Sequence, residues 1–136
     1  MVRSNKAAGT AFEDELAKML HGYGFWVHQI QQNKSGQPAD LIAVRNGRVF
    51  LIDAKDCVNG TFPLSRIEPN QHLAMRMFSQ KAHTVPMFAL RMSENEIYML
   101  SYVEAHQQIL LKRMKSVSKY WCYINCPTLD EWVESV

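Results

Sequence analysis

The sequence places two aspartates where their carboxylates must meet. Asn46-Gly47 separates two apolar runs, residues 40–45 and 48–55. Asn-Gly between such runs predicts a two-residue hairpin turn, because both turn residues must accept positive φ. Counting back from this turn sets Asp40 directly opposite Asp53. Opposed side chains have Cβ atoms about 5 Å apart, so the two carboxylates repel each other unless a cation lies between them.

This pair has the chemistry of a site for a hard divalent cation. Mg²⁺ prefers oxygen ligands and usually takes only a few carboxylates. Lys55 lies two residues after Asp53, so both side chains leave the same face of the strand. A bound cation polarises a phosphate and lowers the pKa of a water, while a lysine orients that water or offsets developing charge. The set therefore predicts phosphodiester hydrolysis with Mg²⁺, for which Mn²⁺ substitutes.

A third carboxylate is expected from the first helix. Glu13 and Glu15 fall at the two edges of its apolar arc, and spacing alone does not choose between them. The alternative to a metal site is a salt-bridged surface patch of Asp53 and Lys55, which would contribute little to stability.

The elements that must position these residues follow from periodicity and turn chemistry. The first helix is expected from an N-cap at Thr10 to a stop at Gly24. Further helices are expected at 69–80, at 103–114 and from residue 128, and loops at 32–39 and 56–68. Strands are expected at 25–31, 40–45, 48–55, 85–91, 96–102 and 120–124. This order predicts an α/β fold, a central mixed sheet flanked by helices, as one domain over residues 1–136.

The composition limits the cell compartment more than the partner. Lys and Arg total 15 against 13 Asp and Glu, and a net charge of +2 neither demands nor excludes nucleic acid. The three cysteines have no Cys-x-x-Cys spacing, so we expect neither a disulfide framework nor a zinc site. No apolar run is long enough to span a membrane. We therefore expect a cytoplasmic protein, in a bacterial or phage-infected cell.

The motif around the two aspartates resembles a known pattern. Glu13, then Pro38-Ala39-Asp40, then Asp53-Ala54-Lys55 is similar to the PD-(D/E)XK nuclease superfamily. Residues 9–13 (Gly-Thr-Ala-Phe-Glu) resemble the first helix of Holliday junction resolvases. Residues 61–64 (Thr-Phe-Pro-Leu) and 70–72 (Asn-Gln-His) resemble RecU-type resolvases, and the shorter Hjc-type enzymes share this skeleton. The resemblance covers residues 7–102.

The resemblance implies a restriction-endonuclease-like core and a role for each matched residue. The metal ligands that it implies are Glu13, Asp40, Asp53 and the backbone carbonyl of Ala54. Lys55 would be the catalytic lysine, and Gln71 would position the phosphate or its water. It also implies a homodimer that cuts two strands of a branched DNA, a four-way junction, and leaves 5′-phosphates.

Basic residues near these motifs are the candidate DNA contacts, because phosphate contacts dominate affinity. They are Arg3, Lys6, Lys34 and Arg66. Phe62 is a candidate for stacking at a branch, although a single Phe is more often buried in the core. The densest basic run, residues 112–119, is either a set of phosphate contacts or the polar end of a helix.

The sequence leaves three functions open. The first is a metal-dependent, structure-selective DNA endonuclease of the Holliday junction resolvase kind, acting in recombination and repair. The second is a nuclease of restriction or repair type that cuts duplex, flap or single-stranded DNA. The third is a non-catalytic DNA-binding module with the same fold. The complete set of three acids and Lys55 argues against the third, because such a module has no need to hold opposed carboxylates.

Overall fold

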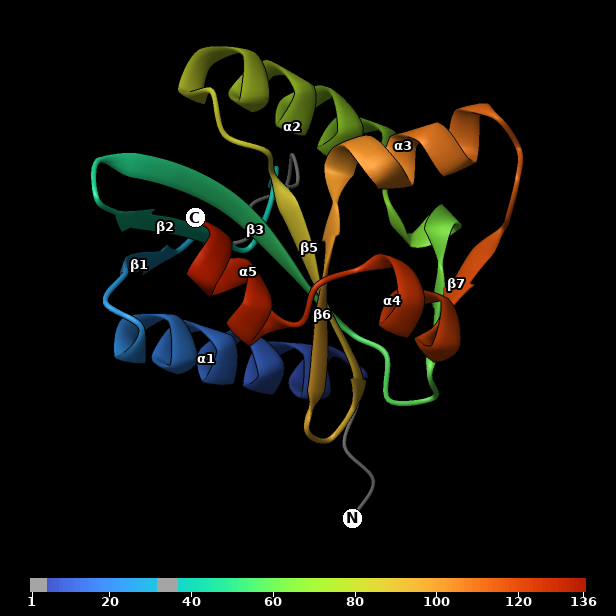
Figure 1. Ribbon diagram of the computed structural model, residues 1–136, viewed down its shortest axis with the longest axis horizontal. Helices are drawn as coiled ribbons and strands as arrows, with labels where there is room; N and C mark the ends of the chain where they lie inside the picture. The colour runs from blue at the N-terminus through green and yellow to red at the C-terminus, as the bar shows by residue number, and fades with distance from the viewer. Residues whose placement is uncertain (1–4, 32–36) are drawn as a thin grey trace.

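A five-stranded sheet forms the centre of the protein (Figure 1). The computed structural model describes residues 5–31 and 37–136, with side chains in the first helix from Ala11 onward. The strands, in spatial order, are β1 (Trp26–Gln29), β2 (Leu41–Arg45), β3 (Arg48–Asp56), β5 (Met87–Ser93) and β6 (Glu96–Ser101). β3 and β5 are parallel and the other neighbours antiparallel, so the predicted mixed sheet is confirmed.

The β2–β3 hairpin has the predicted register. Its ladder ends at Leu41 opposite Ile52, the offset that a two-residue turn requires. The turn residues Asn46 and Gly47 have φ angles of 53° and 75°, so both adopt the left-handed conformation expected of them. Asp40 lies one residue beyond the ladder, and its backbone N–H donates to the carbonyl of Ile52 at 3.2 Å. The hairpin therefore continues as far as the first aspartate.

Two helices, α1 (Asn5–Gly22) and α5 (Leu129–Ser135), cover one face of the sheet (Figure 1). The buried side chains of this layer include Phe12, Leu16, Leu20, Leu41, Ala43, Ile52, Leu129 and Val133. Trp132 of α5 stacks on Phe25, with ring centroids 5.9 Å apart, and meets Phe50 edge-on at 5.2 Å. The C-terminal helix is thus built into the core.

Arg45 fastens α5 to the hairpin. Its guanidinium donates to the carbonyls of Val133 and Val136 at 2.7 and 2.8 Å, and to that of Tyr23 at 3.1 Å. The same group lies 4.4 Å from the ring centroid of Phe25. A cation at the carbonyl end of a helix satisfies acceptors that have no partner within the helix and is favoured by the helix dipole.

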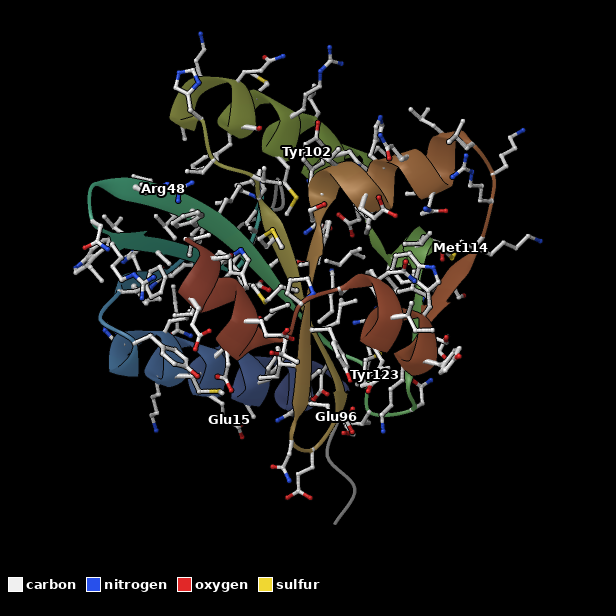
Figure 2. The ribbon with its side chains drawn as sticks, viewed as in Figure 1. Glu15, Arg48, Glu96, Tyr102, Met114 and Tyr123 are labelled. Carbon is white, nitrogen blue, oxygen red and sulfur yellow. The ribbon has the colours of Figure 1, made fainter. Side chains whose placement is uncertain are left out.

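The opposite face is covered by α2 (Pro69–Ala82), α3 (Tyr102–Leu110) and α4 (Lys119–Asn125). A small sheet of β4 (Thr61–Pro63) and β7 (Ser116–Ser118) and a 3₁₀ turn (Leu64–Arg66) complete this layer. Its buried residues include Leu51, Phe62, Leu64, Met75, Phe88, Leu90, Leu100, Ala105, Val117 and Cys122. Figure 2 labels Tyr102 at the start of α3 and Tyr123 within α4. None of the helices in the described ranges is long and apolar enough to cross a membrane.

The structure corrects three of the expected elements. The first helix begins at Asn5, so Thr10 lies within it and does not cap it; Ala7 and Ala8 favour this earlier start. The strand predicted at 120–124 is wrong, because these residues belong to α4. The loop predicted at 56–68 contains β4, which forms only by pairing with β7, a partner distant in sequence.

The last helix is confirmed where the sequence placed it. The hydroxyl of Thr128 accepts from the backbone N–H of Glu131, and the Glu131 carboxylate accepts from the backbone N–H of Thr128. This reciprocal pair is a capping box, a signal that is complete within four residues. Ser118 likewise caps α4 by accepting from the N–H of Trp121, so the missed helix carried a local start signal as well.

Replacing Trp132 with Ala is expected to lower the free energy of unfolding by about 3–5 kcal/mol, because the ring fills the space between two buried phenylalanines. The control is Tyr123→Ala, whose side chain is 73% exposed; it should change the value by less than about 0.5 kcal/mol. Urea unfolding measures both. A Trp132→Ala protein as stable as the wild type would show that α5 does not belong to the folded core.

Candidate active site

Asp40 and Asp53 lie on the same face of the sheet, at the open end of the β2–β3 hairpin. Their neighbours Leu41 and Ile52 are buried in the α1/α5 layer. Because successive strand residues point to opposite faces, both aspartates face the side that α2 covers. Asp53 is only 2% exposed and Asp40 only 7%. The predicted opposition of the two carboxyls is therefore present, and it is buried.

Two hydrogen bonds fix the carboxylate of Asp40. Its Oδ2 accepts from the backbone N–H of Ala54 at 2.8 Å, across the hairpin. Its Oδ1 accepts from the Nε2 of Gln37 at 3.1 Å. The sequence analysis did not select Gln37, although it directly precedes the Pro38 of the motif. Both bonds orient the carboxylate without neutralising it.

Lys55 and Asp53 form an ion pair. The Lys55 Nζ lies 3.0 Å from the Asp53 Oδ2. That oxygen is buried, so the ammonium of Lys55 offsets part of its charge. Burial, followed by the charge of Asp40, raises the pKa of Asp53 to about 7 despite the opposing effect of Lys55.

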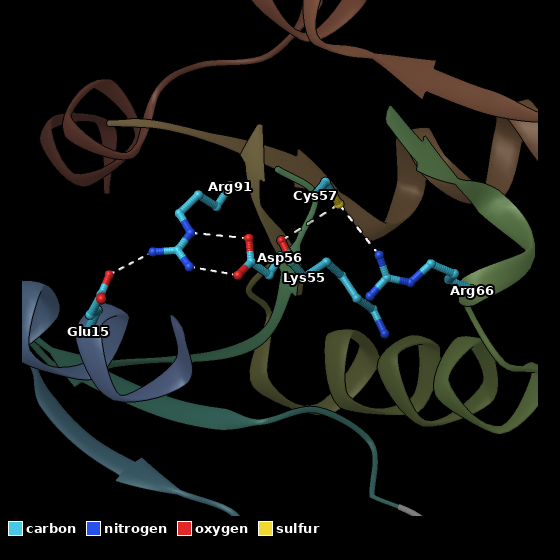
Figure 3. A network of polar contacts seen from close by, with 6 residues as sticks. All are labelled: Glu15, Lys55, Asp56, Cys57, Arg66 and Arg91. Carbon is cyan, nitrogen blue, oxygen red and sulfur yellow. Dashed lines mark hydrogen bonds and ion pairs between the residues drawn. The ribbon is translucent and has the colours of Figure 1, made fainter. Parts of the chain in front are cut away.

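Glu13 brings a third carboxyl from α1. Burial, followed by the negative charge of Asp40 within hydrogen-bonding reach and that of Asp53, raises its pKa to about 7. Glu15 points elsewhere: its carboxylate pairs with Arg91 at 2.8 Å (Figure 3). The structure thus chooses between the two glutamates and brings Glu13 to the aspartates. We call Glu13, Asp40 and Asp53 the carboxylate cluster.

Arg91 sets the position of α1 against the sheet. Its guanidinium binds both carboxylate oxygens of Asp56 at 2.6 and 3.2 Å, in addition to Glu15 (Figure 3). It also lies 4.7 Å from the ring centroid of Phe12, the neighbour of Glu13. Asp56 directly follows Lys55 on β3. This contact, which the sequence did not reveal, joins the segments that carry Glu13 and Lys55.

The carboxylate cluster has the donor set of a hard divalent cation. It offers oxygens only, and the single ammonium of Lys55 does not balance three acids. Within residues 5–31 and 37–136 no three acidic, histidine or cysteine side chains are already arranged around one point as metal ligands. Binding an ion would therefore need side chains of the cluster to rotate.

Gln71 and Arg66 lie on the segment that follows β3. Gln71 is in the first turn of α2, where its Oε1 accepts from the backbone N–H of Glu68 at 3.3 Å, and among the described residues it has no hydrogen bond to the cluster. Arg66 donates to the Sγ of Cys57 at 3.6 Å, and that thiol donates to the carbonyl of Lys55 at 3.7 Å (Figure 3). Arg66 is thus an exposed cation beside the strand that carries Lys55.

Phe62 is not available to stack on a base, so that prediction is wrong. Its side chain is fully buried, 6.3 Å from the ring of Phe88 between centroids. Arg3 and Lys34 lie outside the described residues, as does the side chain of Lys6. In the basic run, Lys112, Arg113 and Lys115 line a groove together with Pro63, Leu64 and Met114, while Lys119 pairs with Glu96 at 2.8 Å.

In the absence of metal, Asp53→Asn is expected to stabilise the protein at pH 8 by more than about 1 kcal/mol and to lose this advantage towards pH 5. The folded-state pKa of Asp53, about 7, exceeds its ordinary value of 3.8. Its contribution to stability is therefore present at low pH and is lost as the pH rises through 7. Thermal unfolding in EDTA measures the difference from wild type. Glu134→Gln, which removes an exposed carboxylate, is the control; an equal effect there, or none in Asp53→Asn, contradicts the assignment.

Comparison with known proteins identifies a family. A sequence model of the archaeal Holliday junction resolvases (Hjc) matches residues 4–124. The structure is similar to that of Hjc, a Holliday junction resolvase from the archaeal hyperthermophile Archaeoglobus fulgidus, with a TM-score of 0.69 and 17% identity over 93% of this chain and 96% of that one. No curated protein gives a significant match.

These findings confirm the resolvase resemblance and the fold class. The structural likeness, at this identity, establishes the fold, while the sequence match covers most of the chain. The family is described as archaeal, so the comparisons give no support to a bacterial or phage source. Holliday junction resolvases are endonucleases, and those of this family depend on a metal ion. This chain belongs to the Hjc family of Holliday junction resolvases.

Proposed function

We propose that the chain cleaves four-way DNA junctions with Mg²⁺ held by Glu13, Asp40, Asp53 and the carbonyl of Ala54. The observation that carries the proposal is the meeting of three carboxyls in a largely buried place, two of them with a pKa raised to about 7. Buried like charges are unfavourable without a compensating cation, so the cluster is explained by the ion that it would bind.

Asp40 and Lys55 have separate roles beside the proposed cation. When bound, the cation would supply Lewis acidity towards the phosphate and lower the pKa of a water. The backbone N–H of Ala54 and the side-chain amide of Gln37 donate to the carboxylate of Asp40, so its orientation is set before any ligand binds. The Lys55 ammonium lies at the mouth of the cluster, where it would hold the attacking water or offset charge on the phosphate.

Two further residues act by position. Gln71 begins the helix that covers the face of Asp53, which supports its role in placing the phosphate or its water. Arg91 touches neither the cluster nor, in this proposal, the substrate. It is a positioning residue, because it fixes the α1 segment of Glu13 to the β3 segment of Lys55 through Glu15 and Asp56.

The DNA would approach the C-terminal end of β3, where Ala54, Lys55 and Asp56 are partly exposed. The exposed Arg66 contacts Cys57, which in turn contacts the carbonyl of Lys55, so we assign Arg66 a phosphate contact. The family resemblance supports a homodimer whose two sites cut two strands of the junction and leave 5′-phosphates. Restriction- or repair-type cleavage of duplex, flap or single-stranded DNA is the second candidate, which the family match disfavours.

Glu13→Gln and Asp53→Asn are each expected to lower the cleavage rate about 10³-fold or more, because the loss of a metal ligand removes several kcal/mol of transition-state stabilisation. Binding of junction DNA should stay near the wild-type level. Asp14→Asn is the matched control for Glu13, since Asp14 is the next residue of the same helix but is exposed and accepts from Gln29, and it should keep most of the activity. Equal losses in Glu13→Gln and Asp14→Asn would contradict the assignment of Glu13.

Cleavage assays test which DNA shape is the substrate. The protein is incubated with labelled four-way junction, duplex or flap DNA, each with Mg²⁺ and with EDTA. We expect paired, symmetric cuts in the junction alone, bearing 5′-phosphates, and none in EDTA. Cleavage of flap or duplex at the same rate would establish the second candidate. Binding of all three without any cleavage would overturn both enzymatic functions.

A further inference from the structure

Two histidines face each other where α2 meets α3. The ring centroids of His72 and His106 are 5.1 Å apart, with the ring planes inclined by 56°. Both residues are half-buried, so solvent reaches the edge of the pair. α2 and α3 lie next to each other on the outer side of the sheet (Figure 1), and Tyr102 stands 6.2 Å from the His106 ring.

The ring nitrogens of this pair lack partners. Both nitrogens of His72 and the Nδ1 of His106 are buried without a hydrogen bond to any described residue. A neutral imidazole has one donor and one acceptor nitrogen, and buried polar atoms in native proteins are normally satisfied. No salt bridge joins either histidine to a described carboxylate. One nitrogen of each ring therefore has a lone pair that no described residue uses, and this points to a ligand that accepts electron pairs from both rings.

The protonation state of His72 suits a metal ion. Burial, followed by the proximity of His106, lowers the pKa of His72, so this ring is neutral at pH 7 and its lone pair is available. Metal ions bind the neutral imidazole and compete with protons for it. Imidazole nitrogens are ligands that Zn²⁺, Cu²⁺ and Ni²⁺ favour, whereas Mg²⁺ favours carboxylate and water oxygens.

The spacing also fits one shared ion. Imidazole nitrogens bind Zn²⁺ at roughly 2.0–2.1 Å, and two such rings at a tetrahedral angle have centroids about 5 Å apart. We propose that His72 and His106 bind a transition-metal ion such as Zn²⁺ between α2 and α3, with water in the other positions. This site uses other residues than the proposed Mg²⁺ site and does not depend on the proposed nuclease function. It would join α2, whose first turn contains Gln71, to α3.

Thermal unfolding with Zn²⁺ tests the site without an activity assay. In buffer with excess Mg²⁺, which occupies the carboxylate cluster, Zn²⁺ at tenfold its Kd should raise the Tm of the wild type by about 4 °C. His72→Gln and His106→Gln should each abolish the shift. His21→Gln, an exposed histidine on α1, is the control and should keep it. No shift in the wild type, or an unchanged shift in His106→Gln, overturns the proposal.

Histidine ring ¹⁵N NMR on the wild type removes any dependence on how the variants fold. Zn²⁺ should move the ring signals of His72 and His106 together, saturating at one ion per chain, and leave those of His21, His28 and His83 in place. Movement of other histidines only, or Zn²⁺ binding with no change in any ring signal, would place the ion elsewhere, for instance on Cys122 and Cys126, and would contradict the site.

Discussion

Electrostatic repulsion between the buried carboxyls of Asp40 and Asp53 is the constraint around which this protein is built. The hairpin register forces the two groups together, and burial removes the water that would screen them. Their surroundings supply two backbone or amide donors to Asp40 and one ammonium to Asp53, which is less positive charge than the three acids of the cluster carry. The folded chain therefore holds unfavourable charge at the site that we propose for metal-dependent cleavage. Binding a cation would relieve this repulsion, so the cluster favours cation binding.

Paired strands and packed helices hold the charged groups of the carboxylate cluster in place. β3 lies inside the sheet, paired to β2 on one side and to β5 on the other, so Asp53 and Lys55 cannot move apart without breaking a ladder. Glu13 belongs to a helix whose apolar side is buried against the opposite face, and Arg91 joins that helix to the end of β3. The stacked ring of Trp132 and the guanidinium of Arg45 attach the C-terminal helix α5 to the same layer. Packing on both faces thus resists the repulsion at the sheet end.

The two proposed metal sites differ in the physics that defines them. The carboxylate cluster is rich in charge and lies at strand ends, where oxygen ligands and a lysine meet. The histidine pair carries nitrogen ligands and lies between helices, where three ring nitrogens have no hydrogen-bond partner among the described residues. Ligand softness separates them, because oxygen sites favour Mg²⁺ and imidazole sites favour Zn²⁺ and its neighbours. An ion between α2 and α3 would act on the layer that carries Gln71 and would leave the carboxylates unchanged.

Local signals in the sequence were enough to determine the hairpin, its register and the meeting of Asp40 with Asp53. A two-residue turn has a single register, and strand alternation then assigns each side chain to a face. The capping box of the last helix is determined in the same way. The sequence did not decide between Glu13 and Glu15, because both lie at edges of the apolar arc. That choice depends on Arg91, which reaches α1 only after β5 has paired with β3. The burial of Phe62 and the strand pairing of β4 with β7 likewise need partners distant in sequence. The same holds for the contact of His72 with His106, since periodicity records which face of an element is apolar but not what packs against it.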